Sequence, residues 1–547
     1  MAAVLAFGVA ASLTACAPAP HTEGTAGQIK KFTGFFTVSM PEIDNNNEIQ
    51  QRLSELTGAE CKETWLTGQT TAEAIGTLVA GGVYPDFISA GEGCQRLYEE
   101  GVLIPLDEYW DDYPNIKNFW TPQQWDRVRR DDGHVYWIPQ FGQVNGKEMG
   151  TVPDEAFWVQ TRVLKWAGYP RLETMDEYFQ LLEAYQAANP AMADGTPNIP
   201  YTILCEGERY FCLENAPQFL DGYPNDGSVI VDPDEEKVID YNTTATAKRY
   251  FAKLNEEFQK GIVDPEFFSQ TYDEYIAKLC SGRVLGMIDQ YWDFGYAVGD
   301  VFKQTGLDAE GCDYIPFGLT IEAGIKNQWK SYTAINGASG LAITTDCKDI
   351  AGALHFVDAL LSPQAATLRS WGEEGVDYLV DDKGVFYRTD TMRAQAVDPA
   401  YKAKHLCAYP YFPNYGGMNP DGVNAAAVDN QPGEFYDSLS EDVQEAFTAY
   451  GVKTYNELLG VNEIPGPWFP LYSFSGTLTT ATPGGTAWTR MGEVKHEWLP
   501  KVVMTPDFEA AWGDYMAAYQ GCKPEDFLAE MQAELERCIA EAAKYQK

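Results

Sequence analysis

Short apolar segments alternate with segments of helical periodicity along the first hundred residues. Runs rich in β-branched and aromatic residues are typical of strands, whereas apolar residues three and four positions apart are typical of helices. The pattern predicts a strand at 31–40, a helix at 46–57, a strand at 61–66, a helix at 70–81 and a strand at 85–90. This order predicts a parallel, doubly wound α/β sheet, with ligands at the carboxyl ends of its strands.

Helix start signals continue along the rest of the chain. In a capping box, a Thr side chain and a Glu three residues later satisfy free backbone N–H groups at a helix start. This motif occurs at Thr70, Thr174 and Thr271, each ahead of apolar residues at helical spacing. From about Pro524 an amphipathic helix is predicted at the C-terminus. Helices and shorter strands therefore alternate throughout.

The first fifteen residues form a separate apolar segment without charge. It is too short to span a bilayer but matches the core of a signal peptide. Small residues precede Cys16, so we expect a lipoprotein signal peptide at 1–15 and a lipid on the Cys16 thiol. Residues 16–30 are small and polar and predict a flexible tether. The alternative is a short buried helix, and the basic start of a signal peptide is missing, since no Lys or Arg precedes Lys30.

Charge and aromatic content narrow the function classes. The 547 residues contain 39 Lys and Arg against 80 Asp and Glu, a formal net charge of −41. Such an acidic protein is not expected to bind nucleic acid or anionic membrane surfaces. The chain also has 14 Trp and 32 Tyr. These aromatic residues serve either as core or as platforms for flat apolar ligand faces such as those of sugars.

Motifs for catalysis, cofactors and metals are missing from the sequence. It contains no CxxC, HExxH, GxSxG, GxGxxG or P-loop motif. Glu373 and Glu374 are adjacent, but side chains at successive positions usually diverge and are poorly placed to act on one bond. We therefore expect no enzyme activity, no cofactor and no metal. Cys205 and Cys212 are the closest cysteine pair, and a disulfide between them stays open.

Several segments, taken together and in order, resemble one family. They are LVAGGVYPD at 78–86, GVLIPLD at 101–107, GHVYWIP at 133–139, SGRVLG at 281–286, WGEEGVDY at 371–378 and FEAAWGDY at 508–515. Through these segments the chain is similar to family 1 extracellular solute-binding proteins, the capture lipoproteins of ABC importers, and to their long, oligosaccharide-binding branch. The resemblance covers nearly all of residues 31–540.

The resemblance implies a two-lobed α/β fold, like that of periplasmic binding proteins, with a ligand cleft at a hinge. We expect residues 31–140 and 310–400 in one lobe and residues 145–305 and 405–547 in the other. The lobes are expected to close on the ligand by hinge motion. The implied function is capture of an oligosaccharide and its delivery to an ABC permease. The protein is then a monomer on the extracellular face of the cell membrane, held there through its lipid anchor alone.

One departure from the family concerns calcium. Members of the long branch often carry an Asp/Asn-rich calcium loop ahead of an Ile-Pro. Here residues 189–200 read NPAMADGTPNIP, and Asp194 is the only carboxylate among them. Calcium takes about six to eight oxygen ligands. We therefore expect a plain loop.

The expected ligand-binding residues lie in family-like passages at strand ends and in loops. An oligosaccharide site needs aromatic faces for the sugar rings and amides or carboxylates for the hydroxyls. Trp292 is the leading candidate because it follows a strand-like run at 284–288. The full set is Glu92, Gln140, Asp289, Tyr291, Trp292, Asp293, Trp329, Tyr415 and Asn419. Tryptophans predicted to lie in helices, namely Trp110, Trp166, Trp498 and Trp512, are expected in the core.

Three other functions stay open from the sequence. The same scaffold can bind a peptide or a modified uronic sugar in place of a neutral oligosaccharide. A secreted carbohydrate-active enzyme needs two carboxylates that converge on one bond, about 5–10 Å apart. A structural surface lipoprotein predicts no cleft and no stabilisation by ligands. The strong negative charge favours a neutral oligosaccharide as the ligand.

Overall fold

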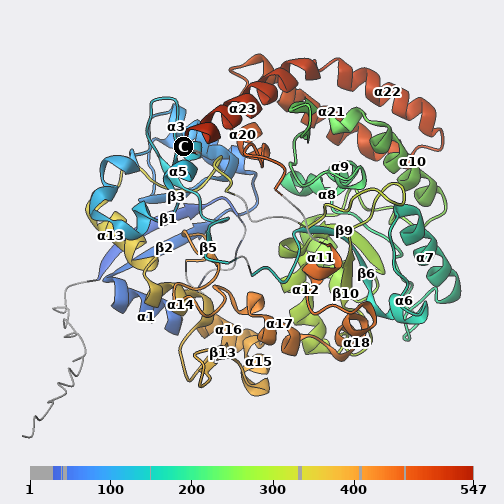
Figure 1. Cartoon of the computed structure of the whole chain (residues 1–547), viewed down its shortest axis with the longest axis horizontal. Coiled ribbons are helices and arrows are strands. Elements are labelled where there is room, and N and C mark those ends of the chain that lie inside the picture. Colours follow the sequence, from blue (N-terminus) through green and yellow to red (C-terminus); the bar gives the residue numbers. More distant parts are fainter. Residues whose placement is uncertain are drawn as a thin grey trace, which may run out of the picture.

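The chain folds into two lobes that lie side by side (Figure 1). The computed structural model describes residues 29–545 except 39, 41–42, 44–45, 148, 331–334, 406–408 and 461–463. Each lobe has its own sheet and its own hydrophobic core. The expected signal peptide, Cys16 and most of the tether lie outside the described residues.

The first lobe is built on a five-stranded sheet in the order β2-β1-β3-β11-β4. Strand β1 pairs in parallel with β2 and β3, as the β-α-β-α-β pattern predicts, whereas β11 runs antiparallel to β3 and β4. The strands are β1 (Lys30–Phe36), β2 (Ala59–Trp65), β3 (Phe87–Ser89), β4 (Trp137–Ile138) and β11 (Leu341–Ile343).

Helices cover both faces of this sheet, and local signals set where they begin. Asn47 caps the first helix by accepting from the Gln50 backbone N–H, and Thr70 and Glu73 form the predicted capping box. Apolar faces of these helices pack on the sheet, which removes them from water. The helices are α1 (Glu48–Thr57), α2 (Thr71–Gly81), α3 (Cys94–Glu99), α4 (Pro114–Lys117), α5 (Pro122–Val128), α13 (Ile350–Leu360) and α14 (Pro363–Trp371).

The second lobe is built on an antiparallel three-stranded sheet in the order β10-β6-β9. All six residues of β6 (Glu155–Gln160) are buried, because the strand lies between β10 (Tyr314–Phe317) and β9 (Gly286–Gln290). Position 286 requires a glycine because β9 passes close to Tyr178 of the helix Met175–Ala188. A Cβ there would lie 2.2 Å from the Tyr178 hydroxyl, which donates to the Trp158 carbonyl across the sheet.

Helices surround this second sheet, and the capping boxes predicted at Thr174 and Thr271 are present. A small hairpin of β7 (Ile230–Asp232) and β8 (Lys237–Ile239) lies beside them. The helices are α6 (Thr161–Trp166), α7 (Met175–Ala188), α8 (Phe211–Glu214), α9 (Ala216–Leu220), α10 (Ala245–Gln259), α11 (Tyr272–Cys280) and α12 (Tyr291–Thr305).

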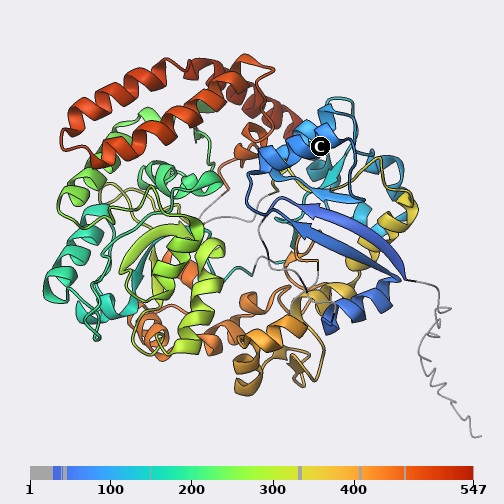
Figure 2. The same ribbon diagram turned by 180° about the vertical axis from the view of Figure 1, so that it is seen from behind.

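Two helical layers join the lobes, one at each end of the molecule (Figures 1 and 2). At the lower end in Figure 1, the Asn47 amide donates to the Ala403 carbonyl and Lys402 forms an ion pair with Asp300 of α12. This layer contains the hairpin β12 (Leu379–Val380) and β13 (Phe386–Tyr387), and α15 (Asp390–Ala396), α16 (Pro399–His405), α17 (Pro432–Ser438), α18 (Glu441–Tyr450) and α19 (Tyr455–Leu458).

At the upper end, the C-terminal helices pack on α10 and reach back to the first lobe. Arg127 of α5 donates to the Phe469 carbonyl at 3.1 Å, and the Tyr545 hydroxyl donates to Asp126. The layer consists of α20 (Tyr472–Ser475), α21 (Pro483–Met504), α22 (Phe508–Gln520) and α23 (Pro524–Tyr545). The predicted C-terminal helix is thus α23, with Phe527, Met531 and Leu535 buried on one face.

The chain crosses between the lobes at different places from those predicted. Strand β10 pairs with β6, so residues 314–317 belong to the second lobe rather than the first. Conversely, Tyr409 and Phe412 pack in the core of the first lobe. Both differences arise from pairings between residues far apart in the chain, which a local pattern does not encode. Among the described residues, no helix is long and apolar enough to cross a bilayer.

Candidate ligand-binding site

An aromatic cluster lies at the carboxyl edge of the first-lobe sheet. Strands β1 and β2 run toward the second lobe and end at Phe36 and Trp65 (Figure 2). The ring centroids of Phe36 and Trp65 are 5.0 Å apart, and Tyr411 packs 5.8 Å from Trp65. Phe141, which follows β4, meets Tyr411 edge-on at 5.7 Å and is 55% exposed. At this edge Phe141 is exposed, Trp65 and Tyr411 are half-buried, and Phe36 is buried beneath them.

Buried polar side chains hold this cluster in place. Gln140 is buried and donates from Nε2 to the Ser89 hydroxyl at 2.9 Å and to the Tyr411 carbonyl. The buried Arg369 of α14 donates to the carbonyls of Tyr409, Phe412 and Pro413, at 2.7, 3.1 and 2.8 Å. Hydrogen bonds from a charged guanidinium are strong in a buried setting. They fix the segment that carries Tyr411.

A second exposed aromatic group lies on the second lobe. Trp292 is the second residue of α12, directly after β9, and is 50% exposed. Its ring lies 5.9 Å from Phe211 of α8, and its indole N–H donates to the Gln290 side-chain oxygen. Figure 1 shows α8, β9 and α12 on the side of the second lobe that faces the first. Tyr296, one turn further along α12, is 49% exposed.

Asp289 and Asp293, which flank Trp292 in the sequence, are buried. Asp289 accepts from the Tyr275 hydroxyl at 2.7 Å and from the Cys212 thiol at 3.2 Å. Burial, together with the neighbouring Asp293 charge, raises the pKa of Asp289 to about 8. Asp293 accepts from Arg209 Nε at 2.7 Å. These two carboxyl groups therefore act inside the lobe, where they support the start of α12.

Cys212, Asp289 and Asp293 also bring three possible metal-ligand atoms within 4.8 Å of one another. A metal requires the thiolate form of cysteine. Burial raises the pKa of the Cys212 thiol well above its ordinary value, and the neighbouring carboxylates add to this. The thiol donates to Asp289, and Arg209 pairs with Asp293. The group is a hydrogen-bonded cluster, and its donors fit a metal poorly.

A further buried carboxyl group, Glu155, stands opposite Gln290 where β6 and β9 pair. Its Oε2 accepts from Asn215 Nδ2 at 3.3 Å and from Gln290 Nε2 at 3.4 Å. Burial raises the pKa of Glu155 to about 8. Hydrogen bonds thus connect the exposed Trp292 to Gln290, and Gln290 to the buried Glu155.

Trp329 is buried in the second lobe, which contradicts the prediction that it contacts a ligand. The side chain is 0% exposed, stacks on Phe219 at 4.2 Å and meets Phe157 edge-on. Its indole N–H donates to the Leu319 carbonyl at 2.6 Å. The polar residues around it in the sequence suggested an exposed loop, but a long-range contact with α9 covers the ring.

Tyr415 and Asn419 pack against the first lobe. The Tyr415 hydroxyl donates to the Leu361 carbonyl at 3.2 Å, and its ring meets Phe119 edge-on at 5.3 Å. Asn419 is 1% exposed and donates to the Thr367 hydroxyl at 2.9 Å. Both side chains serve packing here, and neither lies in the two aromatic groups described above.

Two other predicted residues occupy strand ends. Glu92 is exposed and follows β3, as expected for the carboxyl edge. Tyr291 is half-buried and packs against Trp158 and Tyr455, at 5.7 and 6.1 Å. Ligand contact by Glu92, Tyr291 and Trp292 stays a prediction.

Sequence reasoning missed the first-lobe aromatic cluster and the hydrogen bonds that connect Trp292 to Gln290 and Glu155. Trp65 closes a predicted strand and Phe141 follows the predicted end of another, so strand ends were a usable signal for both. Tyr411 offered no local signal, because Arg369 brings its segment to the sheet from far along the chain. Among the tryptophans expected in the core, Trp110 and Trp512 are buried, but Trp166 is 48% exposed.

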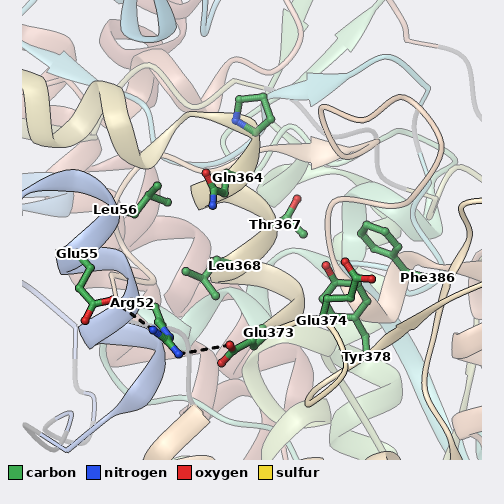
Figure 3. Close-up of a pocket in the computed structure, with 12 residues that line it drawn as sticks. Arg52, Glu55, Leu56, Gln364, Thr367, Leu368, Glu373, Glu374, Tyr378 and Phe386 are labelled. Atoms are coloured by element: carbon green, nitrogen blue, oxygen red, sulfur yellow. Dashed lines mark hydrogen bonds and ion pairs between the residues drawn. The ribbon is translucent and has the colours of Figure 1, made fainter. Parts of the chain in front are cut away.

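The adjacent Glu373 and Glu374 line a different cavity, of about 730 Å³, between α1 and α14 (Figure 3). Glu373 lies 3.6 Å from Arg52, whereas Glu374 lies beside Tyr378 and Phe386. The two carboxylates thus have different surroundings, as expected for neighbours in sequence. This cavity contains none of the predicted binding residues.

The loop 189–200 was predicted to be a loop without a metal ion. Its one carboxylate, Asp194, forms a hydrogen bond within the loop. Asp194 is exposed and accepts from the Thr196 backbone N–H at 2.8 Å, which lowers the pKa of Asp194. Asn198 donates to the Asn189 carbonyl. The described loop therefore closes on itself through hydrogen bonds. Cys205 and Cys212 both carry free thiols.

Comparisons with known proteins bear on the fold and the family resemblance. No family model matches the chain. A curated relative, the fructooligosaccharide ABC transporter substrate-binding protein FusA of Streptococcus pneumoniae serotype 4, is 28% identical over 387 residues. The match covers 66% of this chain and 68% of FusA.

Solved structures share the fold over nearly the whole chain. S. pneumoniae FusA in complex with kestose matches with a TM-score of 0.66 and 18% identity, covering 93% of this chain and 99% of that one. An extracellular solute-binding protein from Bifidobacterium longum subsp. infantis matches with a TM-score of 0.65 and 15% identity, covering 94% and 99%. The predicted two-lobed fold and the resemblance to solute-binding proteins are therefore confirmed.

Proposed function

We propose that this chain, which has the fold and the sequence likeness of ABC-transporter substrate-binding proteins, captures a neutral oligosaccharide between its lobes and delivers it to an ABC permease. The observation that carries the proposal is the presence of an aromatic group on each lobe, in which Phe141 and Trp292 are exposed. Trp65, Phe141 and Tyr411 lie at the facing edge of one lobe, and Trp292 lies on the other. Aromatic faces on both sides suit the apolar C–H surfaces of sugar rings.

The relatives guide the choice of ligand. FusA is described as a fructooligosaccharide-binding protein and has been solved with kestose. We therefore infer that short neutral oligosaccharides, fructooligosaccharides first, are the ligands to test. The net charge of −41 favours an uncharged ligand over an anionic one.

Titration calorimetry of the purified protein tests this function. The panel contains kestose, other neutral oligosaccharides of two to six units, uronate oligosaccharides and peptides of matched length. We expect saturable binding of at least one neutral oligosaccharide. If only peptides bind, the ligand is a peptide and the proposed sugar is wrong. If no compound binds, the proposed function is contradicted.

The bound sugar is expected to leave the protein unchanged. Mass spectrometry of the oligosaccharide after prolonged incubation distinguishes a receptor from an enzyme. An intact sugar agrees with capture, whereas shorter products would identify a carbohydrate-active enzyme.

The proposal includes a lipid anchor on Cys16 at the extracellular face of the membrane. It rests on the apolar segment 1–15 and the small residues before Cys16. Expression of the wild type and the Cys16→Ala variant in a Gram-positive host, followed by fractionation, tests the anchor. We expect the wild type in the membrane fraction and the variant outside it; equal distribution would contradict the anchor.

A further inference from the structure

The cavity between α1 and α14 has an apolar lining on two sides. Its volume is about 730 Å³, and the segment 372–386 forms its third side (Figure 3). Leu56 of α1 lies on one side of the cavity, and Tyr378 and Phe386 lie on the other. Leu368 of α14 lies between them. The cavity thus offers apolar contacts to a group that enters from solvent.

The hairpin of β12 and β13 extends this apolar lining to the protein surface. Val380 stands directly opposite Phe386 in the antiparallel pair. Side chains of directly opposed residues lie on the same face of a hairpin, so Val380 continues the face that lines the cavity. Val380 is 37% exposed, and Leu56 across the cavity is 38% exposed. Exposed apolar residues that gather around a cavity with a polar rim are typical of protein interaction sites.

The cavity also carries an excess of negative charge. Its charged lining residues are Arg52, Glu55, Glu373 and Glu374, one positive group against three negative groups. Arg52 lies 3.3 Å from Glu55 and 3.6 Å from Glu373, so it is shared between these two carboxylates. The Glu374 carboxylate is exposed and forms no hydrogen bond or ion pair with the residues that the structure describes. One carboxylate beside the two aromatic rings is therefore available to a cation.

An arginine side chain suits this combination better than a lysine. Its guanidinium group can donate two parallel hydrogen bonds to one carboxylate, here that of Glu374. A guanidinium is more weakly hydrated than an ammonium group and lies favourably against aromatic rings, here those of Tyr378 and Phe386. The amide of Gln364, which also lines the cavity, offers a donor and an acceptor to the main chain of the same segment.

The arginine has to come from another protein. The sequence ahead of Lys30 contains no Lys or Arg, and Lys30 itself pairs with Asp349 at 2.6 Å. A second copy of this chain carries the same net charge of −41 and is repelled. We propose that the cavity between α1 and α14 is a docking site for an arginine-bearing segment of a partner protein. This site goes beyond the proposed function, because the cavity contains none of the residues expected to bind the sugar.

Titration of a short peptide, followed by NMR of the peptide, tests the docking site. The probe is a capped peptide with one arginine between leucines. Its controls carry lysine or citrulline, the uncharged isostere of arginine, at the same position. We expect the arginine peptide to bind at least about tenfold more tightly than the citrulline peptide, because the charged hydrogen bonds to the carboxylate are lost. Equal binding of these two peptides would overturn the proposal.

Glu374→Gln tests the position of the site. It removes the available carboxylate but keeps the shape of an exposed side chain, so we expect the affinity for the arginine peptide to fall about tenfold or more. Glu441→Gln is the matched control, because Glu441 is exposed on α18 and the net charge changes equally. Equal losses in the two variants would indicate a general attraction of cations to an acidic protein and would overturn the site.

Two further measurements separate this site from other kinds of binding. Capped arginine alone lacks the apolar neighbours and should bind several-fold more weakly than the peptide; equal affinity would overturn docking of a segment. Glu374→Gln should bind oligosaccharide like the wild type, and a loss of sugar affinity would assign the cavity to the sugar site instead. If the wild type binds sugar but no peptide, docking is overturned and the proposed function stands. If it binds peptide but no sugar, the proposed function fails and the docking site stands.

Discussion

Individual side chains near the strand ends have different roles although they are neighbours in sequence. Asp289 and Asp293 flank Trp292, but their carboxyl groups are buried and bonded to Tyr275 and Arg209. Trp292 between them is exposed. The turn from strand to helix at Gln290 sends successive side chains in different directions. Trp292 is therefore accessible from solvent, whereas the two carboxyl groups support the start of α12 from inside the lobe.

Replacement of Trp292 by Ala tests this division of roles. The change removes the stacking face without opening the core, so we expect ligand affinity to fall by about 1–3 kcal/mol with the unfolding temperature nearly unchanged. Titration calorimetry and differential scanning calorimetry give the two values. Trp166→Ala is the matched control, since Trp166 is equally exposed but lies on α6. A variant that binds like the wild type would exclude Trp292 from the site.

At the scale of elements, the aromatic edge of the first lobe is assembled from segments that only tertiary contacts bring together. Strands β1 and β2 contribute Phe36 and Trp65 through local order. Tyr411 reaches them because Arg369 of α14 binds three carbonyls of the 409–413 segment. The guanidinium therefore couples the stability of the lobe to the shape of its aromatic edge.

We expect Arg369→Met to destabilise the protein by about 3 kcal/mol or more. The methionine fills similar volume but leaves three buried carbonyls without their donor. Ligand affinity should fall as well, because the segment carrying Tyr411 loosens. Chemical unfolding and calorimetry measure the two effects. Arg249→Met is the control, because Arg249 is part-exposed and pairs with Asp176 and Glu322 on the surface, where such pairs contribute at most about 1 kcal/mol. Equal effects of the two variants would contradict this role for Arg369.

At the scale of the whole molecule, buried carboxyl groups link stability to pH. Burial raises the pKa of four of them to about 8, namely Glu63, Glu155, Asp226 and Asp289. In the unfolded chain such groups titrate near 4. Between about pH 4 and 8 the folded state thus holds protons that the unfolded chain has released, so stability falls as pH rises. His496 acts in the opposite direction, because burial lowers its pKa.

We therefore expect the unfolding temperature to fall by at least ~3 °C between pH 5.5 and 8.5 at constant ionic strength. Scanning calorimetry at intermediate pH values measures the slope. Asp226→Asn removes one of the four groups and should reduce that slope, while the Leu471 backbone N–H keeps an acceptor in the amide oxygen. An unfolding temperature that rises across this range would contradict the assignment.

The two lobes are joined by helical layers at both ends, and α16 contacts both α1 and α12. If a sugar binds between the lobes, closure shortens the distance across them. We expect the radius of gyration in small-angle scattering to decrease when saturating oligosaccharide is added. The Trp292→Ala variant at the same sugar concentration is the control. Binding without any change in scattering would exclude closure by hinge motion.

Local patterns in the sequence were sufficient to predict the first elements and the outline of the fold. Capping boxes at Thr70, Thr174 and Thr271 mark true helix starts, because a cap satisfies backbone groups within four residues. The first three strands and their parallel order also follow from local periodicity. The ordered family-like passages predicted the two-lobed architecture.

Long-range contacts set the lobe to which β10 belongs, bury Trp329 and bring Tyr411 to Trp65. They also place Glu155 opposite Gln290, next to the start of α12. Each of these depends on contacts between residues far apart in the chain, and the free energy of such contacts is absent from any local pattern. Likewise, Asn419 is buried and bonded to Thr367, and the half-buried Tyr415 donates to the Leu361 carbonyl, so long-range packing holds both side chains.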